Sequence, residues 1–113
     1  MRPADRMKPA ERICAADDIV SGEARQFIVG GHKVAVVRID DDYYAIGDTC
    51  THQNISLSEG EVHPEDRELE CWKHGSAFSL ETGEPNSFPA TRAVPVFVIR
   101  REGDDLMVEV PDE

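Results

Sequence analysis

The sequence predicts an all-β domain built from small antiparallel sheets, and three observations lead to this fold class. Runs of β-branched residues lie in both halves of the chain. Turn residues join these runs in pairs, as is typical of hairpins. The single helix-like stretch, residues 15–21, is too short and too poorly patterned to form a layer. A chain of 113 residues is long enough for one small domain with a modest core.

The first hairpin is the strongest local prediction. Residues 25–29 and residues 32–39 are both rich in valine and isoleucine, and they flank Gly30 and Gly31. Two adjacent glycines tolerate the positive φ angles that a two-residue hairpin turn requires. We therefore expect two antiparallel strands here.

Two further hairpins complete the predicted scaffold. Three consecutive aspartates, residues 40–42, form a polar turn into a short strand over residues 43–46. Near the end of the chain, residues 96–101 and 106–110 alternate apolar and polar side chains around an acidic turn that contains a glycine. This alternation predicts two half-buried strands.

The ends and the middle of the chain differ from these strands. We expect residues 1–10 to form a flexible N-terminal tail and residues 11–113 to form a single domain. Between about residues 47 and 92, glycine, proline, small polar residues and acids dominate, and continuous apolar runs are absent. Such a segment needs more than a hydrophobic core to order it, so we expect a subdomain built from loops around a bound group.

The charge excludes several classes of partner. The chain carries 12 basic and 23 acidic side chains, which gives a net charge of −11. Nucleic acids and anionic membranes both require a basic face, so neither is an expected partner. The longest apolar run, residues 93–99, is far shorter than the roughly 20 residues that span a bilayer. Without an export signal in residues 1–12, we expect a soluble, cytoplasmic protein.

Two boxes in the middle segment combine cysteine with histidine. Cys50 and His52 form the first box, and Cys71 and His74 form the second, with eighteen residues between the boxes. Two thiolates and two imidazoles fit either a tetrahedral zinc ion or a [2Fe-2S] cluster with both cysteines on one iron. Zinc sites usually pair cysteine with cysteine within a box, so the mixed boxes favour the cluster.

These boxes resemble the signature of Rieske ferredoxins, Cys-x-His followed by Cys-x-x-His. The resemblance continues through residues 56–60, 74–78, 82–85 and 89–91. It implies a Rieske-like fold that holds one [2Fe-2S] cluster per chain. Cys50 and Cys71 would bind the buried iron as thiolates, and His52 and His74 would bind the outer iron. Four further residues would surround these ligands, namely Ser76, Phe78, Trp72 and Pro89.

The same resemblance implies roles for three of the surrounding residues. Ser76 keeps the position of a serine that donates a hydrogen bond to the cluster sulfurs in high-potential relatives. Phe78 stands where those relatives have a tyrosine. We expect Trp72 to cover the cluster from water.

The resemblance also implies an electron carrier and not an enzyme. Ile55 and Lys73 stand where Rieske proteins of membrane complexes form a disulfide, which favours the soluble ferredoxins. In that branch a flavoprotein reductase takes a hydride from NAD(P)H, and the ferredoxin carries single electrons to a terminal oxygenase. Similar proteins serve iron–sulfur assembly or form the small subunit of nitrite reductase. A redox-silent zinc module that only mediates contacts is the alternative from another class.

Several other residues have simpler interpretations. We expect Cys14 to be a buried residue of a first strand, His32 to open a strand at the surface, and His63 to lie in a loop. Neither histidine is expected to bind the cluster. The acids between the boxes form either a solvated face or a docking surface for a basic partner. These acids are Glu59, Glu61, Glu65, Asp66, Glu68 and Glu70.

Overall fold

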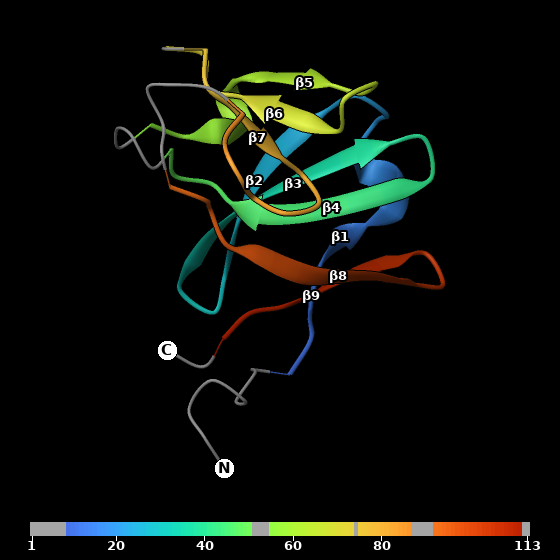
Figure 1. Ribbon diagram of the computed structural model, residues 1–113. Coiled ribbons are helices and arrows are strands. Elements are labelled where there is room, and N and C mark those ends of the chain that lie inside the picture. Colours follow the sequence, from blue (N-terminus) through green and yellow to red (C-terminus); the bar gives the residue numbers. More distant parts are fainter. Residues whose placement is uncertain (1–8, 51–54, 74, 87–91, 112–113) are drawn as a thin grey trace.

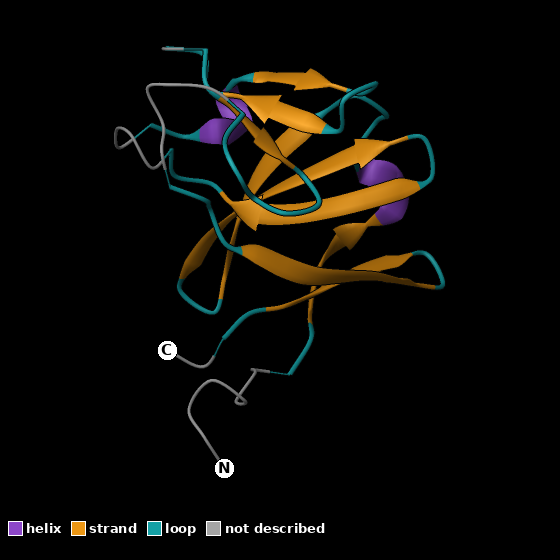
Figure 2. Ribbon diagram, viewed as in Figure 1, coloured by secondary structure: helices purple, strands orange, loops and turns teal. Residues whose placement is uncertain are grey.

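Two antiparallel sheets form the protein, one of six strands and one of three (Figure 1). The computed structural model describes residues 9–50, 55–73, 75–86 and 92–111. Within these residues the helices are two short 3-10 turns, and all other regular structure is strand (Figure 2). No helix in this part of the chain has the length and apolar character needed to cross a membrane.

The elements follow one another in the order β1 Glu11–Ala15, η2 Ala16–Asp18, β2 Ala24–Val29, β3 His32–Ile39, β4 Asp42–Gly47, η3 Leu57–Glu59, β5 Glu61–His63, β6 Glu68–Glu70, β7 Ala77–Ser79, β8 Val96–Glu102 and β9 Asp105–Glu109. The large sheet has the strand order β1-β9-β8-β4-β3-β2. Its two edge strands, β1 and β2, approach each other, so the sheet nearly closes into a barrel. The small sheet has the order β5-β6-β7 and lies against one side of the large sheet (Figure 1).

Strand β3 is buried on both faces and connects two hydrophobic cores. Val34 and Val36 point into the core enclosed by the large sheet. Ala35, Val37 and Ile39 point the other way, into the core shared with the small sheet. This alternation follows from the two-residue period of a strand. A fully buried valine contributes about 1.5–3 kcal/mol of transfer free energy, so β3 stabilises both sheets at once.

The three predicted hairpins are present, with small changes at their turns. Gly30 and Gly31 have φ angles of 54° and 83°, as the two-residue turn between β2 and β3 requires. In the second hairpin Asp40 takes a positive φ, whereas Asp42 already pairs with Ile39 as the first residue of β4. In the third, the turn is shorter than expected, because Glu102 and Asp105 already pair across it.

The middle segment holds more regular structure than its composition predicts. β5, β6 and β7 are each three residues long, and together they form the small sheet. Gly60 joins η3 to β5 where a Cβ atom would lie 1.7 Å from the carbonyl oxygen of Glu70, so only glycine fits. Of the predicted helix-like stretch, only Ala16–Asp18 is helical, as one 3-10 turn. Residues 1–8 of the predicted tail lie outside the described residues.

Candidate metal centre

The two box cysteines lie at the same end of the molecule. β4 and β6 both run toward the left-hand side of Figure 1, and each leads into a segment that carries a cysteine. Cys50 is 3% exposed and Cys71 is fully buried, and both belong to the core between the two sheets. Neither cysteine forms a disulfide. The fold therefore brings the two thiol groups into one buried region.

The two cysteine loops are closed by the same kind of backbone hydrogen bond. The N–H of Cys50 donates to the carbonyl oxygen of Ile55 at 2.8 Å, and the N–H of Cys71 donates to that of Ser76 at 2.7 Å. In both cases the acceptor lies five residues after the cysteine. The N–H of Gly75 also donates to the carbonyl oxygen of Cys71 at 3.0 Å, and Gly75 has the positive φ of 78° that glycine adopts without strain. These hydrogen bonds thus hold the main chain in place at each cysteine.

The thiol side of this site fits an iron–sulfur cluster. Two cysteines in one buried core, with no disulfide between them, supply the soft thiolate pair that one iron of a mixed-ligand [2Fe-2S] cluster takes. His52 and His74, the ligands predicted for the other iron, lie outside the described residues. Their role as ligands stays a prediction from the sequence.

The residues predicted to surround the ligands differ in their environments. Ser76 and Phe78 are both fully buried, and Phe78 pairs with Leu69 across β7 and β6. Trp72 is 57% exposed. Its role as a cover over the cluster stays a prediction from the sequence. Pro89 lies outside the described residues.

The sequence reasoning missed Asp48, a buried carboxylate between β4 and Cys50. Asp48 is only 1% exposed. Its carboxylate accepts hydrogen bonds from the Ser56 hydroxyl at 2.5 Å, from the Ser58 backbone N–H at 2.8 Å and from the side-chain amide of Gln26. The available signal was weak, because an aspartate after an apolar strand usually belongs to a solvated turn.

Cys14 and His32 lie apart from the box cysteines. Cys14 is buried in β1, as predicted, within the core enclosed by the large sheet, and burial raises the pKa of its thiol. His32 begins β3 and packs its ring edge against Phe97, while its Nε2 lies 3.2 Å from the carbonyl oxygen of Pro111.

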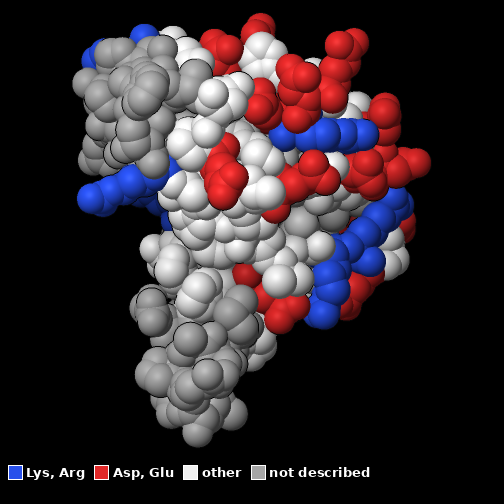
Figure 3. All heavy atoms as spheres, viewed as in Figure 1, with Lys and Arg blue, Asp and Glu red and all other residues white. Residues whose placement is uncertain are grey.

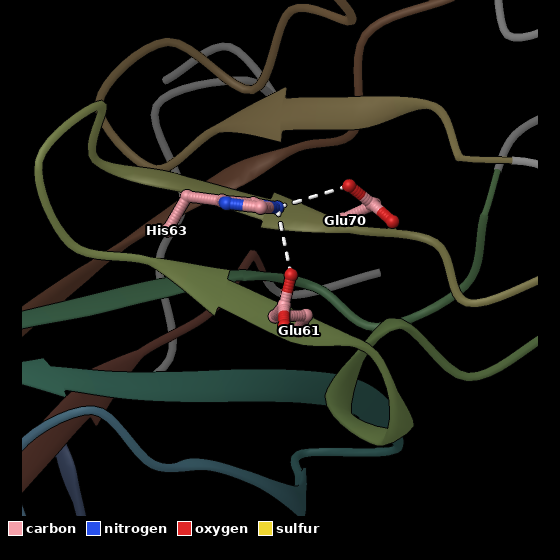
Figure 4. A group of neighbouring side chains, drawn as sticks. All are labelled: Glu61, His63 and Glu70. Carbon is pink, nitrogen blue, oxygen red and sulfur yellow. Dashed lines mark hydrogen bonds and ion pairs between the residues drawn. The ribbon is translucent and has the colours of Figure 1, made fainter.

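His63 ends β5, so the expectation that it lies in a loop is wrong. Its Nε2 lies 2.9 Å from the carboxylate of Glu70 and 3.5 Å from that of Glu61 (Figure 4). The hydrogen bond with Glu70 is the main cause that raises the pKa of His63. These three side chains lie together on the small sheet and form ion pairs when His63 is protonated, and Cys50 and Cys71 do not belong to the group.

A family model for the Rieske [2Fe-2S] domain matches residues 10–98 of the chain. The chain belongs to the Rieske family. The match spans both cysteine–histidine boxes and reaches from β1 into β8. Membership of the Rieske family implies a [2Fe-2S] cluster, in agreement with the buried pair of thiols.

Rieske ferredoxins of dioxygenases are similar to this chain over nearly its whole length. The ferredoxin component of biphenyl 2,3-dioxygenase from Rhodococcus jostii is 34% identical, over 88% of this chain and 91% of the relative. The ferredoxin of carbazole 1,9a-dioxygenase from Nocardioides aromaticivorans has a TM-score of 0.87 at 32% identity, over 89% of this chain and 97% of that one.

A second solved structure contains the oxygenase as well. In the complex of reduced oxygenase and oxidised ferredoxin of carbazole 1,9a-dioxygenase, the matching chain has a TM-score of 0.81 at 39% identity. The match covers 92% of this chain and 94% of that one. Together these similarities confirm the all-β Rieske fold that the sequence predicts.

Proposed function

We propose that this protein is the ferredoxin component of a ring dioxygenase system. It accepts one electron at a time from an NAD(P)H-dependent flavoprotein reductase and delivers it to a terminal oxygenase. The observation that carries the proposal is similarity over nearly the whole chain to ferredoxins of dioxygenases, one of them solved in complex with its oxygenase. Each of these relatives is the electron-transfer component of its system, which supports a carrier and not the catalyst.

The chain's own residues supply the environment for this transfer. A [2Fe-2S] cluster, one per chain, supplies a one-electron couple when bound. Cys50 and Cys71 hold it as thiolates, and their burial keeps water from the sulfur side. His52 and His74 are the imidazole ligands on the other iron. Because backbone hydrogen bonds hold the main chain at Cys50 and Cys71, these two ligands have little to rearrange when the charge changes.

We also propose a cytoplasmic location, as expected from the sequence. Thiols stay reduced in the cytoplasm, which leaves Cys50 and Cys71 available to bind the cluster.

The first experiment tests the bound group. The purified protein should be red-brown and contain about two irons and two acid-labile sulfides per chain. The reduced protein should show an average g value below that of clusters ligated by cysteine alone. His52→Ala and His74→Ala should lose the cluster, whereas the matched controls His32→Ala and His63→Ala should keep it. A colourless protein with one tightly bound zinc ion would overturn the proposal.

The second experiment tests the partners. The cluster-loaded protein, immobilised through its C-terminus, should capture a flavoprotein reductase and a terminal oxygenase from a lysate of its own organism. The two captured proteins, mixed with this protein and NAD(P)H, should then show electron flow that stops when this protein is left out. Capture of nitrite reductase or iron–sulfur assembly proteins, with no oxygenase, would contradict the dioxygenase role.

A further inference from the structure

Asp48 is a buried carboxylate, and its side-chain partners among the described residues are neutral groups. Ser56 and Gln26 donate to one of its oxygens, and the backbone N–H of Ser58 donates to the other at 2.8 Å. All three partners are donors, which is the arrangement that a deprotonated carboxylate requires. Among the described residues, Asp48 forms no ion pair. Within this part of the chain, its negative charge is therefore held in the protein interior by neutral donors.

The same residue joins both ends of the segment that begins the first box. Its backbone N–H donates to the carbonyl oxygen of Lys33 in β3 at 3.1 Å, and its own carbonyl oxygen accepts from the N–H of Leu57 at 2.5 Å. Thr49 and Ser56 form an isolated bridge beside these bonds. Main chain and side chain of Asp48 thus fasten residues 48–50 to residues 55–58, and both parts to the large sheet.

We propose that Asp48 is a positioning residue for Cys50 and a fixed negative charge that favours the oxidised state of the centre. The proposal rests on the proposed function. Two peptide units separate the residues, so their Cα atoms lie at most about 7.6 Å apart. Both residues are buried, and a negative charge in such a poorly hydrated region opposes the addition of an electron nearby. A carboxylate accepts hydrogen bonds at both oxygens and an amide at only one, so the effect of the charge must be compared with that of losing a single hydrogen bond.

Three variants separate the two roles. Asp48→Asn keeps the shape of the side chain, removes its charge and replaces one accepting oxygen by an NH2 group that donates. Ser56→Ala removes one donor and keeps the charge of Asp48. Asp104→Asn is the matched control, because it changes the net charge equally at a side chain that is 94% exposed in the turn between β8 and β9.

The midpoint potential of the cluster-loaded protein tests the charge. Asp48→Asn should shift it upward, because the opposing charge is gone. Ser56→Ala should shift it downward, because the carboxylate loses a donor that spreads its charge. A loss of packing alone would move both variants in the same direction. An Asp48→Asn midpoint no higher than that of Asp104→Asn would overturn the charge role.

The lifetime of the cluster tests the positioning role. With an iron chelator in excess, the visible absorbance should decay several-fold faster in Asp48→Asn and Ser56→Ala than in the wild type. In Asp104→Asn it should decay at the wild-type rate. Wild-type lifetimes in both variants would overturn positioning. If Asp48→Asn fails to fold, Ser56→Ala alone decides, since it should shorten the lifetime and lower the midpoint. A wild-type protein without iron and sulfide would instead refute the proposed function.

Discussion

Ser76 and Phe78 are two fully buried residues beside the second cysteine loop, and they differ in what they can donate. The carbonyl oxygen of Ser76 closes that loop by accepting from Cys71. The Ser76 hydroxyl is a hydrogen-bond donor, whereas the ring of Phe78 has no donor group. A donor to the sulfurs of a reduced, more negative cluster stabilises that state and raises the reduction potential.

The first prediction concerns these two side chains. Ser76→Ala should lower the midpoint potential, because it removes the only hydroxyl of the pair. One net hydrogen bond of roughly 1–2 kcal/mol corresponds to about 40–90 mV for one electron. Phe78→Tyr should raise the midpoint by a similar amount. Voltammetry on the cluster-loaded variants measures both shifts.

Phe27→Tyr is the matched control for this prediction, because Phe27 packs against the core enclosed by the large sheet. Its midpoint should equal that of the wild type. An unchanged midpoint in Ser76→Ala would mean that the hydroxyl donates elsewhere and that Ser76 acts only as a small residue of the loop.

Residue by residue, the candidate site is predictable where its signal is local. Cys50 and Cys71 stand out because a ligand motif is defined by residue type and short spacing. Asp48 could not be found in this way, since its partners Gln26 and Ser56 are 22 and 8 residues away. Its burial depends on how β2 and the segment before η3 come together, which only the tertiary structure shows.

At the scale of elements, strand length decides what the sequence reveals. The strand β3 has eight residues, enough for its apolar character and flanking glycines to predict a hairpin. β5, β6 and β7 have three residues each, too few for a recognisable alternation. These strands gain their stability from tertiary contacts, in which Leu69 and Phe78 bury their side chains against the large sheet.

The second prediction concerns the pairing of β5 with β6. Glu61 faces Glu70 across the two strands, and His63 lies on the same side of β5, so its imidazole, when protonated, stands close to two carboxylates (Figure 4). The hydrogen bond with Glu70 raises the pKa of His63 in the folded protein. The contact therefore makes its full contribution to the free energy of unfolding below the unfolded-state pKa of about 6.5. This contribution is lost as pH rises through the raised pKa of the folded protein.

The melting temperature, followed by circular dichroism across this pH range, measures the effect. At low pH the wild type should have a higher melting temperature than His63→Gln, and this difference should shrink as pH rises. The histidine side chain is one-third exposed, so the difference should be small. In a Glu70→Gln background the effect of His63→Gln should lose most of its pH dependence. A difference that grows with pH would contradict the assignment.

For the whole molecule, both the net charge and its distribution over the surface bear on docking. The net charge is −11, and acidic side chains gather over the small sheet in the view of Figure 3. The six acids between the two boxes are all at least partly exposed. Like charges on one face repel one another, and a basic partner surface relieves that repulsion. A docking role for this face is therefore testable through its dependence on salt.

The third prediction is that electron transfer to the oxygenase slows as salt is added. Charges further apart than about 10 Å are largely screened at 0.1 M salt, so long-range attraction weakens first. The second-order rate constant, measured by stopped flow with the reduced protein in excess, should fall with ionic strength. Glu65→Lys should lower it at low salt and flatten the salt dependence, while the limiting rate at saturation stays unchanged. Asp104→Lys makes the same change of charge in the turn between β8 and β9 and should have the smaller effect. Equal effects of the two substitutions would show that net charge alone steers the encounter and that the acids of the small sheet are only a solvated face.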